Sequence, residues 1–68
     1  MVKVQVLETS KISPLIFIVV SEGTTFEYTL MEDTAPEVLR EMKKAAHLRA
    51  TVILDVNDVR STHRVGVR

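Results

Sequence analysis

The order in which short segments of different periodicity follow one another constrains this chain most. Three strand-like segments come first, at residues 2–7, 15–20 and 24–31. One amphipathic helix is expected over residues 35–47, and two further strands are expected over residues 50–56 and 63–67. The order β-β-β-α-β-β within 68 residues is typical of a small five-stranded Greek-key barrel of the mainly β class. Such barrels commonly bind a ligand or a partner.

The strands are predicted from their alternating side chains. Val2, Val4 and Val6 are separated by polar residues, which indicates a strand with one buried face. The segment 15–20 is apolar throughout, so we expect both of its faces to be covered, by the core and by a helix or a neighbouring subunit. Gly23 is expected to supply the positive φ of a hairpin turn.

The helix carries the clearest local signals. Thr34 and Glu37 are spaced as a capping box, and Pro36 lies in the first turn, where its missing N–H costs nothing. One face of the helix is apolar and comprises Val38, Leu39, Met42, Ala45 and Ala46. The stretch 57–62 is polar and is interpreted as a loop before the last strand.

Length and composition limit how the fold is stabilised. A chain of 68 residues forms one domain, residues 1–68, with a small core. Cysteine is absent, which excludes disulfides and thiolate metal sites. Self-association is the expected reinforcement, with a closed ring as one form of it, and a well-packed monomer is the alternative. We expect no metal site and no cofactor.

Charge is distributed unevenly along the sequence, although the formal total is zero. Residues 1–39 hold two bases and six acids, a balance of −4, whereas residues 40–68 hold seven bases and three acids, a balance of +4. Such asymmetry indicates a basic binding face, or an acidic patch that meets a basic patch on a neighbouring subunit. The candidate nucleic-acid or partner-binding residues are Arg49, Arg60, His63, Arg64 and Arg68. The candidate oligomer interface comprises Glu22, Glu27, Glu32 and Asp33.

Two classes of function remain after the chemical motifs are considered. The sequence contains no glycine-rich phosphate loop, no nucleophile elbow and no thiol nucleophile, so we expect no catalytic residues and no enzyme activity. A protein-interaction module that oligomerises is the first hypothesis. Single-stranded nucleic-acid binding is the alternative, because barrels of this kind bind single strands with a basic groove and stacking aromatic residues. Only Phe17, Phe26 and Tyr28 are aromatic, and their positions are typical of a core.

The element order resembles the OB-fold superfamily, and the layout of three segments, residues 23–28, 38–46 and 51–54, resembles that of the B subunits of bacterial AB5 enterotoxins. The resemblance implies a five-stranded OB-like barrel, a ring of subunits and, as a further alternative, glycan binding. A ferredoxin-like or other α+β sandwich is the alternative fold.

Location is inferred from segments that are absent from the sequence. Met1 leads directly into an alternating strand, so no signal peptide is recognised, and the longest apolar run is too short to cross a bilayer. We therefore expect a cytoplasmic protein without a membrane partner.

Overall fold

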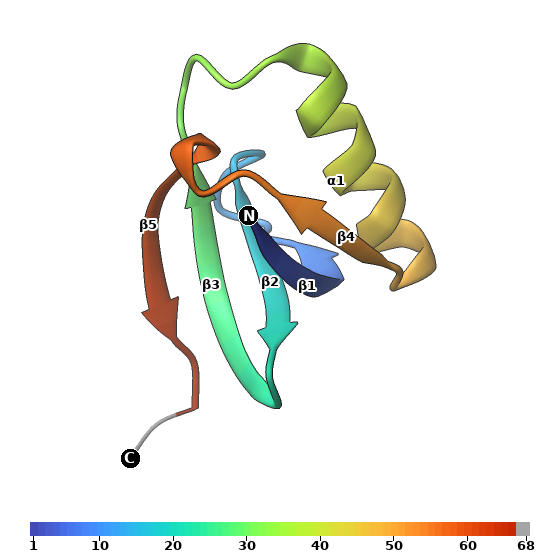
Figure 1. Ribbon diagram of the computed structural model, residues 1–68, viewed down its shortest axis with the longest axis vertical. Coiled ribbons are helices and arrows are strands. Elements are labelled where there is room, and N and C mark those ends of the chain that lie inside the picture. Colours follow the sequence, from blue (N-terminus) through green and yellow to red (C-terminus); the bar gives the residue numbers. More distant parts are fainter. Residues whose placement is uncertain (67–68) are drawn as a thin grey trace.

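The computed structural model describes residues 1–66 and contains a five-stranded antiparallel sheet and one helix (Figure 1). The order β-β-β-α-β-β is confirmed, with one turn of 3-10 helix added between the last two strands. The elements are β1 (Val2–Thr9), β2 (Ile16–Ser21), β3 (Thr24–Leu30), α1 (Pro36–Leu48), β4 (Thr51–Leu54), η1 (Val56–Asp58) and β5 (Val59–Arg64).

The strands are ordered β4-β1-β2-β3-β5, so the last two strands form the two edges of the sheet. All four pairings are antiparallel, and β4 and β5 therefore run in the same direction. The sheet is strongly curved, and η1 carries the chain from one edge to the other (Figure 1). The helix lies over β1 and beside β4 at one end of the concave face (Figure 1).

The hydrophobic core lies on the concave face of the sheet beneath α1. Its fully enclosed side chains include Phe17, Leu30 and Met42. The alternation predicted for β1 is confirmed, because Val4 and Val6 are buried whereas their polar neighbours are exposed. Among residues 1–66, the buried core comprises Val4, Val6, Phe17, Val19, Tyr28, Leu30, Met42, Ala45 and Leu54.

The convex face of β2 is less covered than expected. Phe17 and Val19 point into the core and are fully buried, but Ile16, Ile18 and Val20 are only half-buried on the other face. Side chains of the paired strands shield this face in part, since Ile18 lies between Glu8 of β1 and Glu27 of β3. The expectation that a helix covers this face is therefore wrong for the described residues, because α1 packs on the concave side.

The turn between β2 and β3 is a two-residue hairpin loop closed by the Ser21–Thr24 pair. Its central residues, Glu22 and Gly23, have φ values of 50° and 78°. Positive φ at both positions is the geometry that matches the twist of two antiparallel strands. The prediction for Gly23 is confirmed, while the left-handed conformation of Glu22 has no signal in the sequence.

The predicted capping box is wrong. The N-cap of α1 is Ala35, no side chain caps the helix, and Pro36 occupies the first turn as predicted. Thr34 is buried instead, and its hydroxyl donates a hydrogen bond of 3.5 Å to the carbonyl oxygen of Asp58. This tertiary contact takes the hydroxyl away from the helix and ties the preceding loop to η1.

The structure differs from the prediction in the C-terminal part of the chain. The segment 57–62, predicted as a polar loop, contains the end of η1 and most of β5. The Asp55 carboxylate accepts a 2.9 Å hydrogen bond from the Asn57 amide and starts η1. The strand predicted over residues 63–67 begins earlier, at Val59, and positions 67 and 68 lie outside the described residues.

Candidate interaction surfaces

The free edge of β5 is the first candidate surface. The amide of Val65 donates a 3.0 Å hydrogen bond to the carbonyl of Thr25, which sets the register against β3. In an antiparallel pair, alternate residues direct both backbone groups towards the partner strand. Ser61 and His63 therefore face β3, whereas the backbone groups of Thr62 and Arg64 point away from it. Residues 60–64 are all exposed, so this backbone edge is open to a partner.

Three of the predicted basic residues lie on this strand, and we call Arg60, His63 and Arg64 the basic edge. Arg64 is opposite Phe26 of β3, and His63 is opposite Glu27. Directly opposed residues share one face of a sheet. Arg64 and Phe26 thus lie on the concave face, while His63 and Glu27 form a cross-strand pair of acid and base on the convex face.

A cavity of about 340 Å³ adjoins the basic edge. Its walls combine apolar side chains with the polar side chains of β5, and they comprise Val2, Tyr28, Val56, Val59, Arg60, Ser61 and Thr62. Pockets that hold small ligands or single side chains begin at about this size. Tyr28 is a core residue with 6% exposure, and its ring is tilted by 57° against that of Phe26 at 5.9 Å.

Arg49 is placed apart from the basic edge. It ends α1 in the left-handed conformation with φ of 53°, and its carbonyl accepts a 3.0 Å hydrogen bond from the Gln5 side chain. The chain then enters β4, which is separated from β5 by three strands in the order of the sheet. Arg49 therefore has a structural role at the helix end. Arg68 lies outside the described residues.

The four acidic residues of the candidate oligomer interface are dispersed. Glu22 lies in the turn at one end of β3, whereas Glu32 and Asp33 follow the other end. A strand of this length separates its ends by about 20 Å. Glu27 lies between them on the convex face, opposite His63. The structure therefore does not gather these four residues into one patch.

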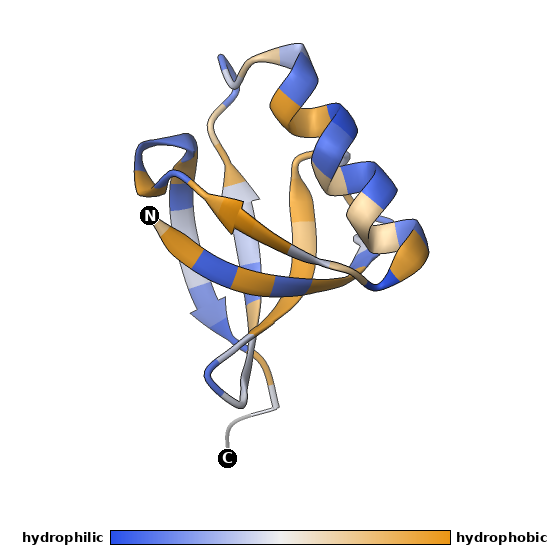
Figure 2. Cartoon of the chain, turned by 45° about the vertical axis from the view of Figure 1, so that its right-hand side comes forward, coloured by the Kyte–Doolittle hydropathy of each residue, from blue (hydrophilic) through white to orange (hydrophobic). Residues whose placement is uncertain are grey.

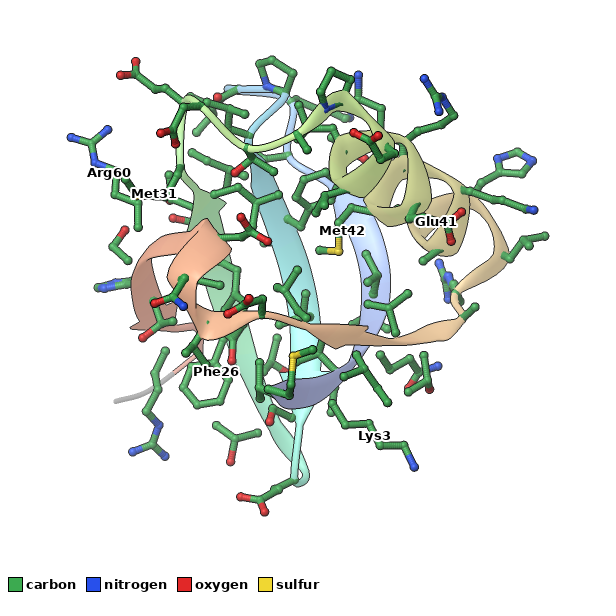
Figure 3. All side chains as sticks on the ribbon, turned by 45° about the horizontal axis from the view of Figure 1, so that its top comes forward. Lys3, Phe26, Met31, Glu41, Met42 and Arg60 are labelled. Atoms are coloured by element: carbon green, nitrogen blue, oxygen red, sulfur yellow. The ribbon has the colours of Figure 1, made fainter. Side chains whose placement is uncertain are left out.

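The second candidate surface is a groove of about 220 Å³ between α1 and β4. Apolar residues form most of it, and Glu37 and Glu41 line it from the helix. We call it the acid-rimmed groove; it is lined by Glu37, Val38, Glu41, Met42, Val52, Ile53 and Leu54. Figure 3 shows Met42 reaching from α1 towards β4.

The backbone of β4 also has a free edge. The Val6 amide donates a 2.9 Å hydrogen bond to the carbonyl of Ala50, so Val52 and Leu54 face β1, and Thr51 and Ile53 face away. The sequence analysis does not predict this surface, because the position of Glu37 indicates a helix cap and Glu41 lies outside the apolar face of the helix. The spacing of two carboxylates by four residues is the one signal that could have indicated it.

Other kinds of site find little support in the described part of the chain. Within residues 1–66, no group of three or more acidic or histidine side chains is arranged to hold a metal ion. Over the same residues, no helix combines the length and the apolar character needed to cross a membrane. No protein-family model, no curated protein and no solved structure matches this chain.

Proposed function

We propose that this protein is a non-enzymatic interaction module that binds an extended, acidic segment of a partner protein along the free edge of β5. The observation that carries the proposal is the juxtaposition, on one exposed strand, of outward-facing backbone groups at Thr62 and Arg64 with three basic side chains. Addition of a partner strand to a sheet edge uses backbone hydrogen bonds for affinity and side-chain pockets for selectivity.

The cavity beside β5 supports this mode of binding. A strand paired with β5 presents every second side chain to the concave face, where the cavity of about 340 Å³ is lined by Tyr28, Val56 and Val59. Arg60 and Arg64 stand along the same strand and attract carboxylates. The expected ligand therefore alternates acidic residues with at least one apolar residue.

Partial closure of the sheet into an OB-like barrel belongs to the same proposal. The parallel course of β4 and β5, joined by η1 across the curved sheet, supports such a barrel. In that arrangement the concave face is a core, and binding is left to the edges. Self-association is also part of the proposal, because so small a core benefits from a partner.

The test is a binding titration followed by fluorescence anisotropy. The probe is a labelled peptide of alternating glutamate and valine, with a lysine–valine peptide as its charge-reversed control. We expect Arg60→Glu with Arg64→Glu to abolish binding, since like charges then face each other. The matched control is Arg40→Glu on the exposed side of α1, which should bind as the unaltered protein does. Equal binding by all three proteins contradicts the proposal.

Thr62→Pro separates backbone pairing from charge attraction. Proline removes the outward N–H of Thr62 and leaves the basic edge intact. Strand addition predicts that this variant loses the peptide, whereas simple charge attraction predicts that it keeps it. Circular dichroism checks that the variant retains its sheet.

Single-stranded nucleic acid is the second candidate, favoured by the position of Arg64 opposite the half-buried ring of Phe26. An aromatic ring beside a base is the usual platform for stacking. The same titration with a labelled oligothymidine of about ten nucleotides distinguishes the two ligands. Binding that weakens steeply with salt and on Phe26→Ala supports nucleic acid, and no binding at low salt excludes it.

A further inference from the structure

The residues that line the acid-rimmed groove are apolar or acidic, and they indicate the kind of segment that fits it. Val38, Met42, Val52 and Leu54 form an apolar floor, and Glu37 and Glu41 are the charged residues that line it in the described part of the chain. These two residues lie one helical turn apart, so both carboxylates project along the same side of the groove. Such a groove suits an extended segment in which apolar side chains alternate with basic ones.

The C-terminal segment of this chain has that composition. Its sequence is Arg64-Val65-Gly66-Val67-Arg68, with an arginine at each end and two valines between them. Val65 is 41% exposed although it is apolar, and it follows directly on β5. We propose that the acid-rimmed groove of one copy of this protein binds the segment Arg64–Arg68 of a second copy.

The course of the chain favours a segment from another copy. β5 ends opposite Phe26, at the end of the strand pair remote from Leu30, whereas α1 follows Leu30 along the chain. Figure 1 shows the end of β5 directed away from α1. The groove lies between α1 and β4, and three strands separate β4 from β5 in the order of the sheet.

Two different surfaces of the same chain meet in this contact, so the assembly is head-to-tail. The valines of the segment cover the apolar floor, and the arginines approach Glu37 and Glu41. Lys44 stands beside Glu41 in a neighbouring hollow of about 130 Å³, and its charge directs the incoming arginines towards the Glu37 end of the groove. Arg64 belongs to both surfaces, but the groove does not take part in strand addition at β5, so variants of Glu37 and Glu41 test the head-to-tail contact alone.

The test is the molar mass in solution, measured by light scattering over a wide range of protein concentration. We expect a mass that rises with concentration and falls with salt, since exposed charge pairs are screened. Glu37→Lys with Glu41→Lys should weaken association at least about tenfold, because like charges then oppose each other. Single replacements give a control with the same change of charge: Glu37→Lys should weaken association, whereas Glu8→Lys, which lies outside the groove, should associate normally.

Deletion of residues 65–68 provides a second test of the head-to-tail contact. It removes the valines, the last arginine and the hydrogen bond from Val65 to Thr25, and it keeps residues 59–64 of β5. Each altered protein alone should be monomeric, yet a mixture of the truncated chain and the Glu37→Lys, Glu41→Lys chain should form a one-to-one dimer. In that dimer the intact segment of one protein occupies the intact groove of the other.

A protein that is monomeric at every concentration overturns the inference. So does normal association of the truncated chain or of the groove variant. A monomer that still binds the acidic peptide at β5 refutes the head-to-tail contact and the self-association included in the proposed function, while strand addition at β5 then stands.

Discussion

The two edge strands of the sheet, β4 and β5, both expose unpaired backbone groups, but they differ in the charge of their side chains and in the elements beside them. β4 has four residues without a charge, and α1 lies beside it across the acid-rimmed groove. β5 has six residues, three of them basic, and all but the first of them are exposed. Figure 2 shows the contrast, with β4 hydrophobic and β5 hydrophilic.

An unpaired edge invites association with other chains, and proteins limit this by covering the edge or by placing charges on it. In this protein α1 flanks β4, whereas three basic side chains lie on β5. We propose that this difference gives the two edges different partners: an apolar and basic segment at β4 and its groove, and an acidic segment at β5.

Among the variants that test this comparison, Met42→Ala is expected to change the free energy of unfolding most. Met42 is 1% exposed and holds α1 against the core next to β4. Removal of its side chain should lower the free energy of unfolding by about 2–5 kcal/mol. Urea denaturation measures this change. A loss below about 0.5 kcal/mol, as at surface positions, would mean that α1 does not support the β4 edge.

A pair of proline variants tests the edge of β5. His63→Pro removes an N–H that faces β3, whereas Thr62→Pro removes one that faces outwards. His63→Pro should therefore destabilise the protein by at least about 1 kcal/mol more, the net value of one backbone hydrogen bond. Denaturation of both variants under the same conditions measures the difference. Equal losses would show that β5 pairs in another register.

The smallest change in the free energy of unfolding is expected for a substitution on the convex side of β4. Ile53 is 68% exposed, so Ile53→Lys should change the free energy of unfolding by no more than about 0.5 kcal/mol. Val52, its neighbour, faces the concave side and is half-buried, and Val52→Lys should cost more than about 1 kcal/mol. Thermal unfolding of the two variants compares the faces. Similar losses at both positions would contradict the exposure of the convex side.

The first half of the fold is well predicted by local pattern. Alternating valines predict β1 and its buried face, and Gly23 predicts the turn between β2 and β3. Proline and the spacing of apolar residues predict α1 with Met42 in the core. The conformations of β1, of the hairpin turn and of α1 are determined by residues that are close in the sequence, so local patterns predict them.

The candidate surfaces are predicted less well. Residues 60–64 are exposed on both faces of this edge strand, so the segment lacks alternating apolar side chains and its polar composition predicts a loop over residues 57–62. Arg49 belongs to the basic half of the sequence but ends a helix away from β5. The spacing of Thr34 and Glu37 predicts a capping box, but the Thr34 hydroxyl donates its hydrogen bond to the Asp58 carbonyl. Glu37 lines the acid-rimmed groove instead.

The sequence by itself determined which segments extend, where the chain turns and which side chains enter the core, because periodicity and backbone preference act over a few residues. Only the tertiary structure decided that β4 and β5 form opposite edges, that three bases share one of them and that two carboxylates border a groove beside the other. These arrangements depend on pairing between strands that are distant along the chain, and no short stretch of sequence encodes such pairing.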